Sequence, residues 1–293
     1  MVFHVHKGDQ DFKQKLQSLL HERGAEETGL EEFLTDLEET ESIKGAWWVA
    51  LDISNQPRGA LTVRYMNKLS YLRSVWTRVD QIEDAQSASR ALLSQWLETS
   101  RSETQKFQAD LPFFSPLISS LMDTGFKKEK ILLSSYELTN DWYAEELPDG
   151  YAMRPIEISE LSVIYDTLIK SDLDTSSPIY ITKDAFIEFG SQLPDSVKSS
   201  WVGVQDNKGK LVGFAASFLS LVKDEPKAVL YGPHSVEPKI VRCLIGETLT
   251  FWKSKGINDT RILRVSEFHP SIENYFNMKL SHETIRYSVN RSA

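Results

Sequence analysis

The feature that most constrains this chain is an internal repeat as long as a whole domain. Three stretches of the first half recur in the second half at nearly the same interval. They begin at Trp48 and Trp201, at Gly59 and Gly213, and at Val79 and Val236. Solenoid repeats are far shorter, roughly 20–50 residues. We therefore expect two copies of one domain, the first in residues 1–140 and the second in residues 141–293.

Length and composition agree with two globular domains. The 293 residues, 41% of them hydrophobic, can form two ordinary cores. A net charge of −9 argues against general affinity for nucleic acid or for anionic membranes, because both are polyanions. The single cysteine, Cys243, excludes an internal disulfide and a cysteine-rich metal site. With no apolar leader at the start, we expect a cytoplasmic protein without a metal.

The hydrophobic pattern predicts the same order of elements in both halves. Each half reads as a strand, two helices, three strands, a helix, a strand, a helix and a last strand. In the first half the three central strands are expected at 46–52, 59–65 and 69–79, and the helix after them at 86–100. The second half repeats this order from Tyr151 onward.

A strand runs directly into a helix around Pro238. The apolar run Lys227 to Gly232 predicts the strand, and Leu244, Leu249 and Trp252 form the apolar face of the helix. The first N–H groups of a helix lack partners within it, and the helix dipole is positive at that end. This turn is therefore suited to a phosphate group.

The stretch 236–249 resembles the acyl-CoA pyrophosphate loop of the GCN5-related N-acetyltransferases, Val-x-Pro-x-x-Arg-x-x-Gly-x-Gly-x-x-Leu. The matching positions are Val236, Pro238, Gly246 and Leu249. Val241 replaces the usual Arg, and Leu244 replaces the first Gly. Since the order of elements is similar as well, the resemblance covers nearly the whole chain. It implies an α/β (α+β) class with two tandem domains, each a mixed, mostly antiparallel sheet flanked by helices.

The resemblance implies transfer of an acyl group, typically acetyl, from acetyl-CoA to a small-molecule or protein amine. It places the CoA in the second half, on Ser235, Val236, Val241, Arg242, Cys243, Leu244, Ile245, Gly246, Glu247 and Asn277. The amine must lose a proton, so a general base is required. The candidates for that base are His234, Glu237 and Glu267.

The first copy departs further from the loop. Ser87 and Ser89 replace the two glycines, and Asp84 replaces the Arg beside Glu83. Carboxylates repel a pyrophosphate, so we expect the first copy not to bind CoA. The Tyr that often protonates the leaving thiolate in this family is Leu121 in one copy and Asn277 in the other. The alternative is a non-catalytic binding or scaffold protein in which both loops have decayed.

Overall fold

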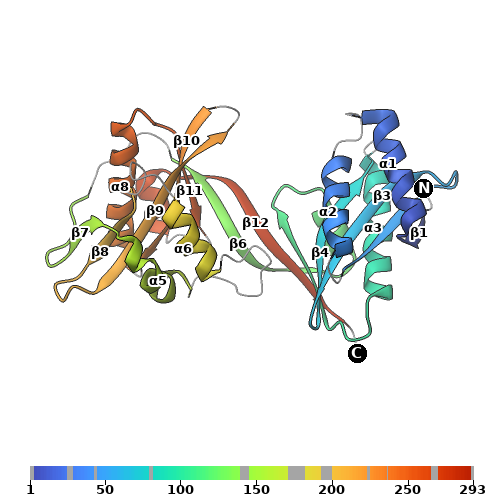
Figure 1. Cartoon of the computed structure of the whole chain (residues 1–293), viewed down its shortest axis with the longest axis horizontal. Coiled ribbons are helices and arrows are strands. Elements are labelled where there is room, and N and C mark those ends of the chain that lie inside the picture. The colour runs from blue at the N-terminus through green and yellow to red at the C-terminus, as the bar shows by residue number, and fades with distance from the viewer. Residues whose placement is uncertain are drawn as a thin grey trace. The chain divides into compact units, whose positions relative to one another are not determined.

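A computed structural model describes residues 3–24, 29–42, 45–78, 82–138, 145–170, 182–192, 200–222, 225–235, 237–264 and 270–291. Its contacts divide the chain into two compact units (Figure 1). Unit 1 comprises Met1–Lys130 and Ile285–Ala293, and unit 2 comprises Ile131–Thr284. A domain boundary between residues 140 and 141 stays a prediction.

Unit 1 has the predicted order of elements. They are β1 (His4–Lys7), α1 (Gln10–Arg23), α2 (Leu30–Ser42), β2 (Gly45–Leu51), β3 (Pro57–Met66), β4 (Leu69–Thr77), α3 (Ile82–Thr99), β5 (Lys106–Pro112), α4 (Leu117–Asp123) and the beginning of β6 (Lys127–Glu137). Strands β1 to β5 lie side by side in chain order. Neighbouring strands are antiparallel except β4 and β5, which are parallel.

The paired tryptophans of β2 show why the sheet of unit 1 needs helices on both faces. Successive side chains of a strand point to opposite faces. Trp47 packs with Leu16 and Leu37 of α1 and α2. The indole of Trp48 donates to Thr99 Oγ1 of α3, 3.1 Å away. Both indoles are buried, so each face of the strand requires a helical cover.

Unit 2 repeats the arrangement, and its first helical segment changes from 3₁₀ to α to π geometry along a continuous run from Ile158 to Ile169. Its elements are β7 (Ala152–Pro155), the turn η2 (Ile158–Glu160), α5 (Leu161–Ile164), η3 (Tyr165–Ile169), α6 (Lys183–Gln192), β8 (Val202–Gln205), β9 (Leu211–Val222), β10 (Glu225–Ser235), α8 (Pro238–Ser254), β11 (Thr260–Arg264), α9 (Pro270–Phe276) and β12 (Lys279–Asn290). The strands run in the order β6-β11-β10-β9-β8-β7. The β10–β11 pair is parallel.

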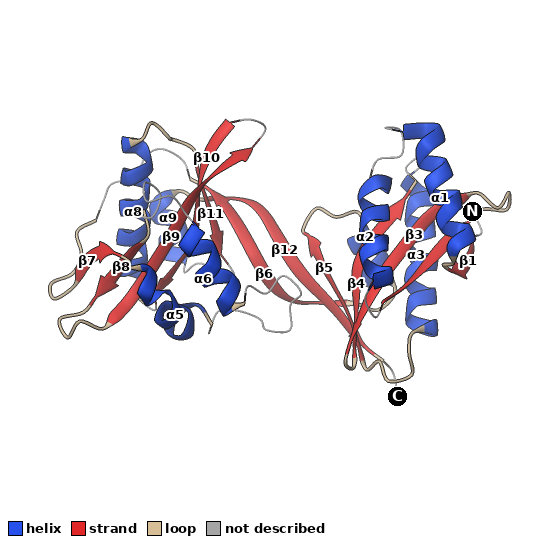
Figure 2. Ribbon diagram, viewed as in Figure 1, coloured by secondary structure: helices blue, strands red, loops and turns tan. Residues whose placement is uncertain are grey.

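Two apolar clusters cover the sheet of unit 2. One joins Leu244 and Ile245 of α8 and Phe276 of α9 to sheet residues such as Leu230. The other joins α5, η3 and α6 to the sheet through Phe186, whose ring stacks on Trp201 at 5.9 Å. Figure 2 shows these helices around strands β7 to β11.

The strands β6 and β12 each have residues in both units. In β6, Lys127–Lys130 belong to unit 1 and the rest to unit 2; in β12, the residues from Ile285 onward belong to unit 1. Within unit 2, Ser281 Oγ of β12 donates to the Ser135 carbonyl of β6 at 3.0 Å. Within unit 1, Arg286 of β12 bonds Asp110 of β5. The end of the chain thus completes the sheet of the unit that begins it.

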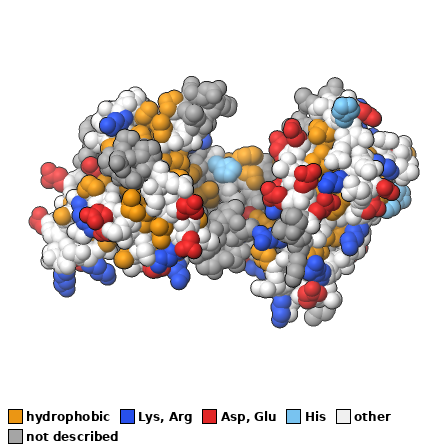
Figure 3. Space-filling model, viewed as in Figure 1, with side chains coloured by type: hydrophobic (Ala, Val, Ile, Leu, Met, Phe, Trp, Pro, Cys, Tyr) orange, Lys and Arg blue, Asp and Glu red, His pale blue; other side chains and the backbone are white. Residues whose placement is uncertain are grey.

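The predicted fold class is confirmed: each unit is a mixed, mostly antiparallel sheet with helices on both faces. The helix expected at 86–100 begins earlier, at Ile82. No described helix is long and apolar enough to cross a membrane. In Figure 3, acidic and basic side chains are mixed over the visible face of the described residues.

Candidate functional site

The strands β4 and β5 of unit 1 begin together and then separate. They are paired over three residue pairs, from Leu69 with Lys106 to Tyr71 with Gln108. Beyond this point β4 continues to Thr77 and β5 to Pro112. Strand β4 also bulges at Arg73, which has no opposite residue in β3. The parting of the two strands exposes backbone groups that normally bond a neighbouring strand.

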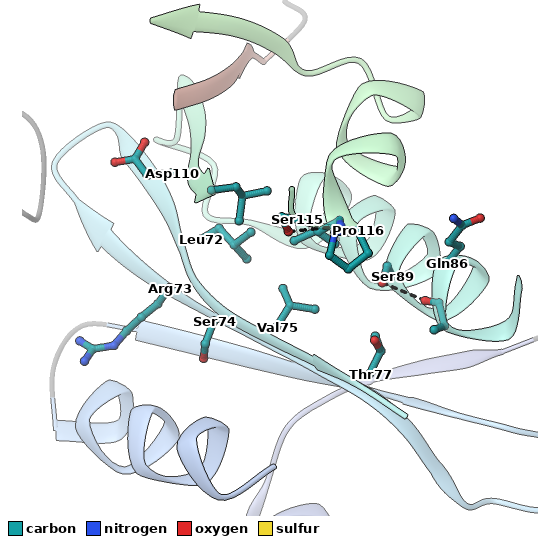
Figure 4. Close-up of a pocket in the computed structure, with 13 residues that line it drawn as sticks. Leu72, Arg73, Ser74, Val75, Thr77, Gln86, Ser89, Asp110, Ser115 and Pro116 are labelled. Carbon is teal, nitrogen blue, oxygen red and sulfur yellow. Dashed lines mark hydrogen bonds between the residues drawn. The ribbon is translucent and has the colours of Figure 1, made fainter. Parts of the chain in front are cut away.

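A cavity of about 380 Å³ lies where the strands separate (Figure 4). Its lining comes from β4, from α3, from the end of β5 and from the start of α4. The lining residues are Leu72, Arg73, Ser74, Val75, Thr77, Ala85, Gln86, Ser89, Asp110, Leu111, Ser115, Pro116 and Leu117. Figure 4 shows Val75 and Thr77 pointing toward the helices, whereas Arg73 points to the opposite side of β4. The volume and the mixed lining are typical of a small-molecule site.

The charges of the cavity wall are already compensated. Arg73 forms ion pairs with Asp36, at 3.3 Å, and with Glu39, both on α2. Arg286 donates to both carboxylate oxygens of Asp110, at 2.9 and 2.8 Å, and both side chains are almost fully buried. Burial and the Asp110 carboxylate raise the pKa of Tyr71. The wall therefore offers a ligand mainly apolar and hydroxyl groups, without a free charge to pair with a phosphate.

The start of α3 does not form a glycine-type loop. Ser87 and Ser89, at the two glycine positions, lie within the helix and donate to the carbonyls of Glu83 and Ala85 at 2.8 and 2.9 Å. The first turn carries Glu83 and Asp84. Helical N–H groups are bonded within the helix after its first turn, and a Cβ prevents the close approach that glycine allows. This end of the cavity is poorly suited to a pyrophosphate.

The corresponding turn of unit 2 is helical from Pro238 onward. Val241 N–H donates to the carbonyl of Glu237 at 3.1 Å, so the predicted CoA residues from Val241 to Glu247 lie inside α8 rather than in an open loop. The predicted residues that are buried there are Val241, Cys243, Leu244, Ile245 and Gly246. Glu247 and Asn277 are exposed, and Asn277 has a positive φ of 46°. Ser235 ends β10, and Val236 lies outside the described residues.

Arg242, the cation of this predicted site, contacts two side chains of unit 2. Its Nε donates to Glu145 Oε2 at 2.9 Å, and its guanidinium lies 5.2 Å from the ring centre of Tyr275. The structure places the Tyr275 ring against the cation of the predicted CoA site. A pyrophosphate would have to compete with the Glu145 carboxylate for Arg242.

The structure places two of the three candidate bases near this turn. His234 is buried near the end of β10, with its ring centre 5.4 Å from that of Tyr231. Glu237 accepts a hydrogen bond of 2.9 Å from Tyr151 O–H, and this bond raises the pKa of Tyr151. Glu267 lies outside the described residues. Among the described residues, no group of His, Cys, Asp and Glu could hold a metal ion.

The resemblance to the acetyltransferases implies that the pantetheine lies where the fourth and fifth strands separate, but the residues that line the cavity of unit 1 were not assigned from the sequence. The residues that were assigned belong to the pyrophosphate loop, whereas the lining of the cavity depends on where β4 and β5 part and on Asp110. The partner of Asp110, Arg286, lies near the far end of the chain, and no local spacing joins the two residues. An available signal was the run Leu111-Pro112-Phe113-Phe114-Ser115-Pro116, whose two prolines mark the end of a strand before a helix.

The geometry agrees with solved structures that span the whole chain. A GCN5-related N-acetyltransferase from Sphaerobacter thermophilus has a TM-score of 0.57 at 13% identity, over 99% of this chain and 96% of that one. A tandem GNAT protein from the clavulanic acid biosynthesis pathway has a TM-score of 0.53 at 12% identity, over 100% of this chain and 99% of that one. A GNAT-family acetyltransferase from Colwellia psychrerythraea has a TM-score of 0.53 at 13% identity, over 98% of this chain and 99% of that one.

No family model matches the sequence, and no curated protein matches it. The likeness to the solved structures shows the fold: this chain has the tandem GCN5-related N-acetyltransferase fold. The resemblance drawn from the sequence is confirmed at that level. Fold alone does not determine activity, which has to be argued from the site.

Proposed function

We propose that this protein transfers an acyl group from a CoA thioester to an amine, and that unit 1 holds the thioester arm. The observation that carries the proposal is the cavity of about 380 Å³ between β4, β5 and α3. A pantetheine arm is long, narrow and rich in amides. It needs strand-edge N–H and C=O groups to bond and apolar walls to pack against, and the separated strands supply both.

The reaction is a simple exchange of bonds. The amine, once it has lost a proton, attacks the thioester carbonyl; a C–N bond forms and the C–S bond breaks. The departing thiolate then takes up a proton. Asp110 is the carboxylate of the cavity wall, but Arg286 occupies both of its oxygens. We therefore propose that Asp110 neutralises the charge of Arg286, and that water or the acceptor takes the proton from the amine.

The second unit is the location that the sequence predicts for the CoA. The support for that assignment is the matching loop and the exposed Lys239 in the first turn of α8. Two features weigh against it: the residues from Val241 onward are helical, and Arg242 is paired with Glu145. The acceptor is proposed to be a small-molecule or protein amine, and the protein to act in the cytoplasm without a metal.

A second candidate is a non-catalytic binding or scaffold protein. The observation in its favour is that acidic side chains stand at both helix starts, Glu83 and Asp84 at α3 and Glu237 at α8. Leu121 and Asn277 also replace the usual thiolate acid. This candidate predicts a chain that keeps the fold and binds no thioester.

Calorimetric titration of acetyl-CoA into the full chain tests the proposal. We expect micromolar binding, about −8 kcal/mol. Ala85→Phe, which fills the cavity, should abolish it, whereas Glu98→Phe on the same helix outside the lining should not. Lys239→Glu in unit 2 should leave the affinity unchanged. Loss of binding in Lys239→Glu but not in Ala85→Phe would move the site to unit 2, and no binding at all would favour the scaffold.

A further inference from the structure

We infer that unit 1 has a second ligand site, which binds a small organic acid with two separated carboxylates. The site is a cavity of about 310 Å³ between strands β1 to β3 and the end of α3, and its two cations are Lys7 and Arg101. It shares no lining residue with the cavity between β4 and β5. Gln86 lines that cavity and Thr99 lines this one, and they are about 20 Å apart along α3. The inference therefore does not depend on acyl transfer.

The strand register places three lining residues on the face of the sheet that α3 covers. Trp48 of β2 is on that face, because its indole bonds α3. Lys7 of β1 is directly opposite Trp48, and directly opposite residues of neighbouring strands point to the same face. On the other side of β2, Leu61 of β3 is opposite Trp48, and Tyr65 lies four residues further along β3. Because side chains alternate along a strand, Tyr65 shares this face.

The cations of this cavity are available to a ligand. Among the residues that the structure describes, no carboxylate forms an ion pair with Lys7 or Arg101. The Arg101 guanidinium lies over the ring of Tyr65, 4.4 Å from its centre, and this contact leaves the N–H groups at its edge free to donate. The acidic Glu103 accepts a hydrogen bond from Ser102 rather than from Arg101. A guanidinium edge binds a carboxylate with two parallel hydrogen bonds.

The segment that carries Arg101 is fixed by a residue from the end of the chain. Arg291 Nη1 donates to the carbonyls of Arg101, Ser102 and Thr104, at 2.7, 3.2 and 3.4 Å. Its Nη2 donates to the carbonyl of Ser100 at 3.1 Å. The backbone at Arg101 is thus held in place before a ligand arrives, which lowers the entropy lost on binding.

The two cations approach the cavity from opposite ends. Lys7 belongs to β1, whereas Arg101 lies over Tyr65 of β3, and these strands flank β2 at roughly 10 Å from each other. Along the strands, Lys7 and Tyr65 are four positions apart, or roughly 13 Å. Cations on two sides attract two distant charges more strongly than two charges on one atom, because each Coulomb attraction falls with distance. This geometry favours a dicarboxylate over a phosphate.

Calorimetric titration of the full chain at low ionic strength, with succinate, glutarate and adipate, tests the inference. At least one of these dicarboxylates should bind with a Kd below about 1 mM. The monocarboxylate of the same length should bind at least tenfold more weakly, and so should inorganic phosphate. The corresponding diamide, which carries no charge, should not bind measurably.

Four variants locate the ligand. Lys7→Gln and Arg101→Gln should each weaken the tightest dicarboxylate at least tenfold. Lys128→Gln removes an exposed lysine of β6 in the same unit and should change its affinity less than twofold. Ala85→Phe, in the cavity between β4 and β5, should also change it less than twofold. Lys7 and Arg101 are exposed, so their variants should melt at the wild-type temperature.

The comparison of probes on the wild type decides the inference even where a variant folds poorly. If none of the three dicarboxylates binds, or if phosphate binds more tightly than all of them, the inference is wrong. A dicarboxylate affinity that both Gln variants leave unchanged would also overturn it. Loss of binding in Ala85→Phe would assign the ligand to the cavity between β4 and β5 and would contradict a separate site.

Discussion

The buried ion pair between Arg286 and Asp110 gives the sharpest stability prediction. The side chains are 1% and 3% exposed, and two hydrogen bonds of 2.9 and 2.8 Å join them. Removing one member leaves the other charge buried without a partner, which lowers the free energy of unfolding by about 3–5 kcal/mol. We therefore expect Arg286→Met and Asp110→Asn each to lower the free energy of unfolding of unit 1 by that amount.

Urea unfolding of the full chain, followed by circular dichroism, measures this cost. The double variant should lose less than the sum of the two single variants, because the second substitution removes the charge that the first left unpaired. The control is Arg90→Met, whose partner Asp123 is 2.6 Å away and half exposed. An exposed pair contributes about 0–1 kcal/mol, so the control should change little. Costs below about 1 kcal/mol for both single variants would refute the reasoning.

Three further predictions concern other parts of the fold. Burial raises the pKa of Asp52, but the hydrogen bonds that its carboxylate accepts in the turn outweigh this effect, and the pKa of Asp52 is lowered overall. The ionised carboxylate therefore stabilises the fold at neutral pH. This stabilisation is lost as the pH falls through the lowered pKa. Asp52→Asn should therefore destabilise the chain at pH 7 and match the wild type in strong acid, as urea midpoints against pH would show. Trp252→Phe removes the buried 2.8 Å bond to Ser217 Oγ and should cost about 1–3 kcal/mol in urea unfolding, with an unchanged free energy contradicting this. In Gly213→Ala the new Cβ would lie 2.7 Å from Ile240 Cγ2 of α8, and the expected cost is about 1–3 kcal/mol; a raised melting temperature would contradict it.

The repeated order of elements could be read from the sequence because it follows from local patterns. Apolar strand runs and helical periodicities are set by which residues must be buried. Trp47 and Trp48 lie in such a continuous apolar run, and both are buried because both faces of β2 are covered. The start of α8 was predicted for the same reason, since Pro238 fixes a first helical position.

That β6 and β12 each contribute residues to both units could not be predicted in this way. The pattern of β12 specifies a strand, but not which sheet receives Arg286, because that choice depends on a partner far along the chain. The cavity has the same origin: it depends on where the β4–β5 pairing stops, after Tyr71, and a strand pattern does not encode the point where two strands part.

In the candidate site of unit 2, the motif resemblance did not predict the backbone conformation of the aligned segment. The fourteen-residue stretch 236–249 can be aligned by its Val, Pro, Gly and Leu, yet those positions do not say whether the segment is a loop or a helix. In unit 2 the apolar residues Val241, Leu244 and Ile245 pack into the core, and their burial favours a helix from Pro238 onward. The CoA residues assigned to that segment stay a prediction.

The most direct test of the central claim is thiol release from acetyl-CoA with a panel of amines, measured on the full chain. If unit 1 holds the thioester, Ala85→Phe should lower kcat/KM at least tenfold for every amine that reacts. Glu98→Phe and Lys239→Glu should stay within twofold of the wild type. Activity that survives Ala85→Phe and disappears in Lys239→Glu would contradict the account and place the chemistry on the second unit.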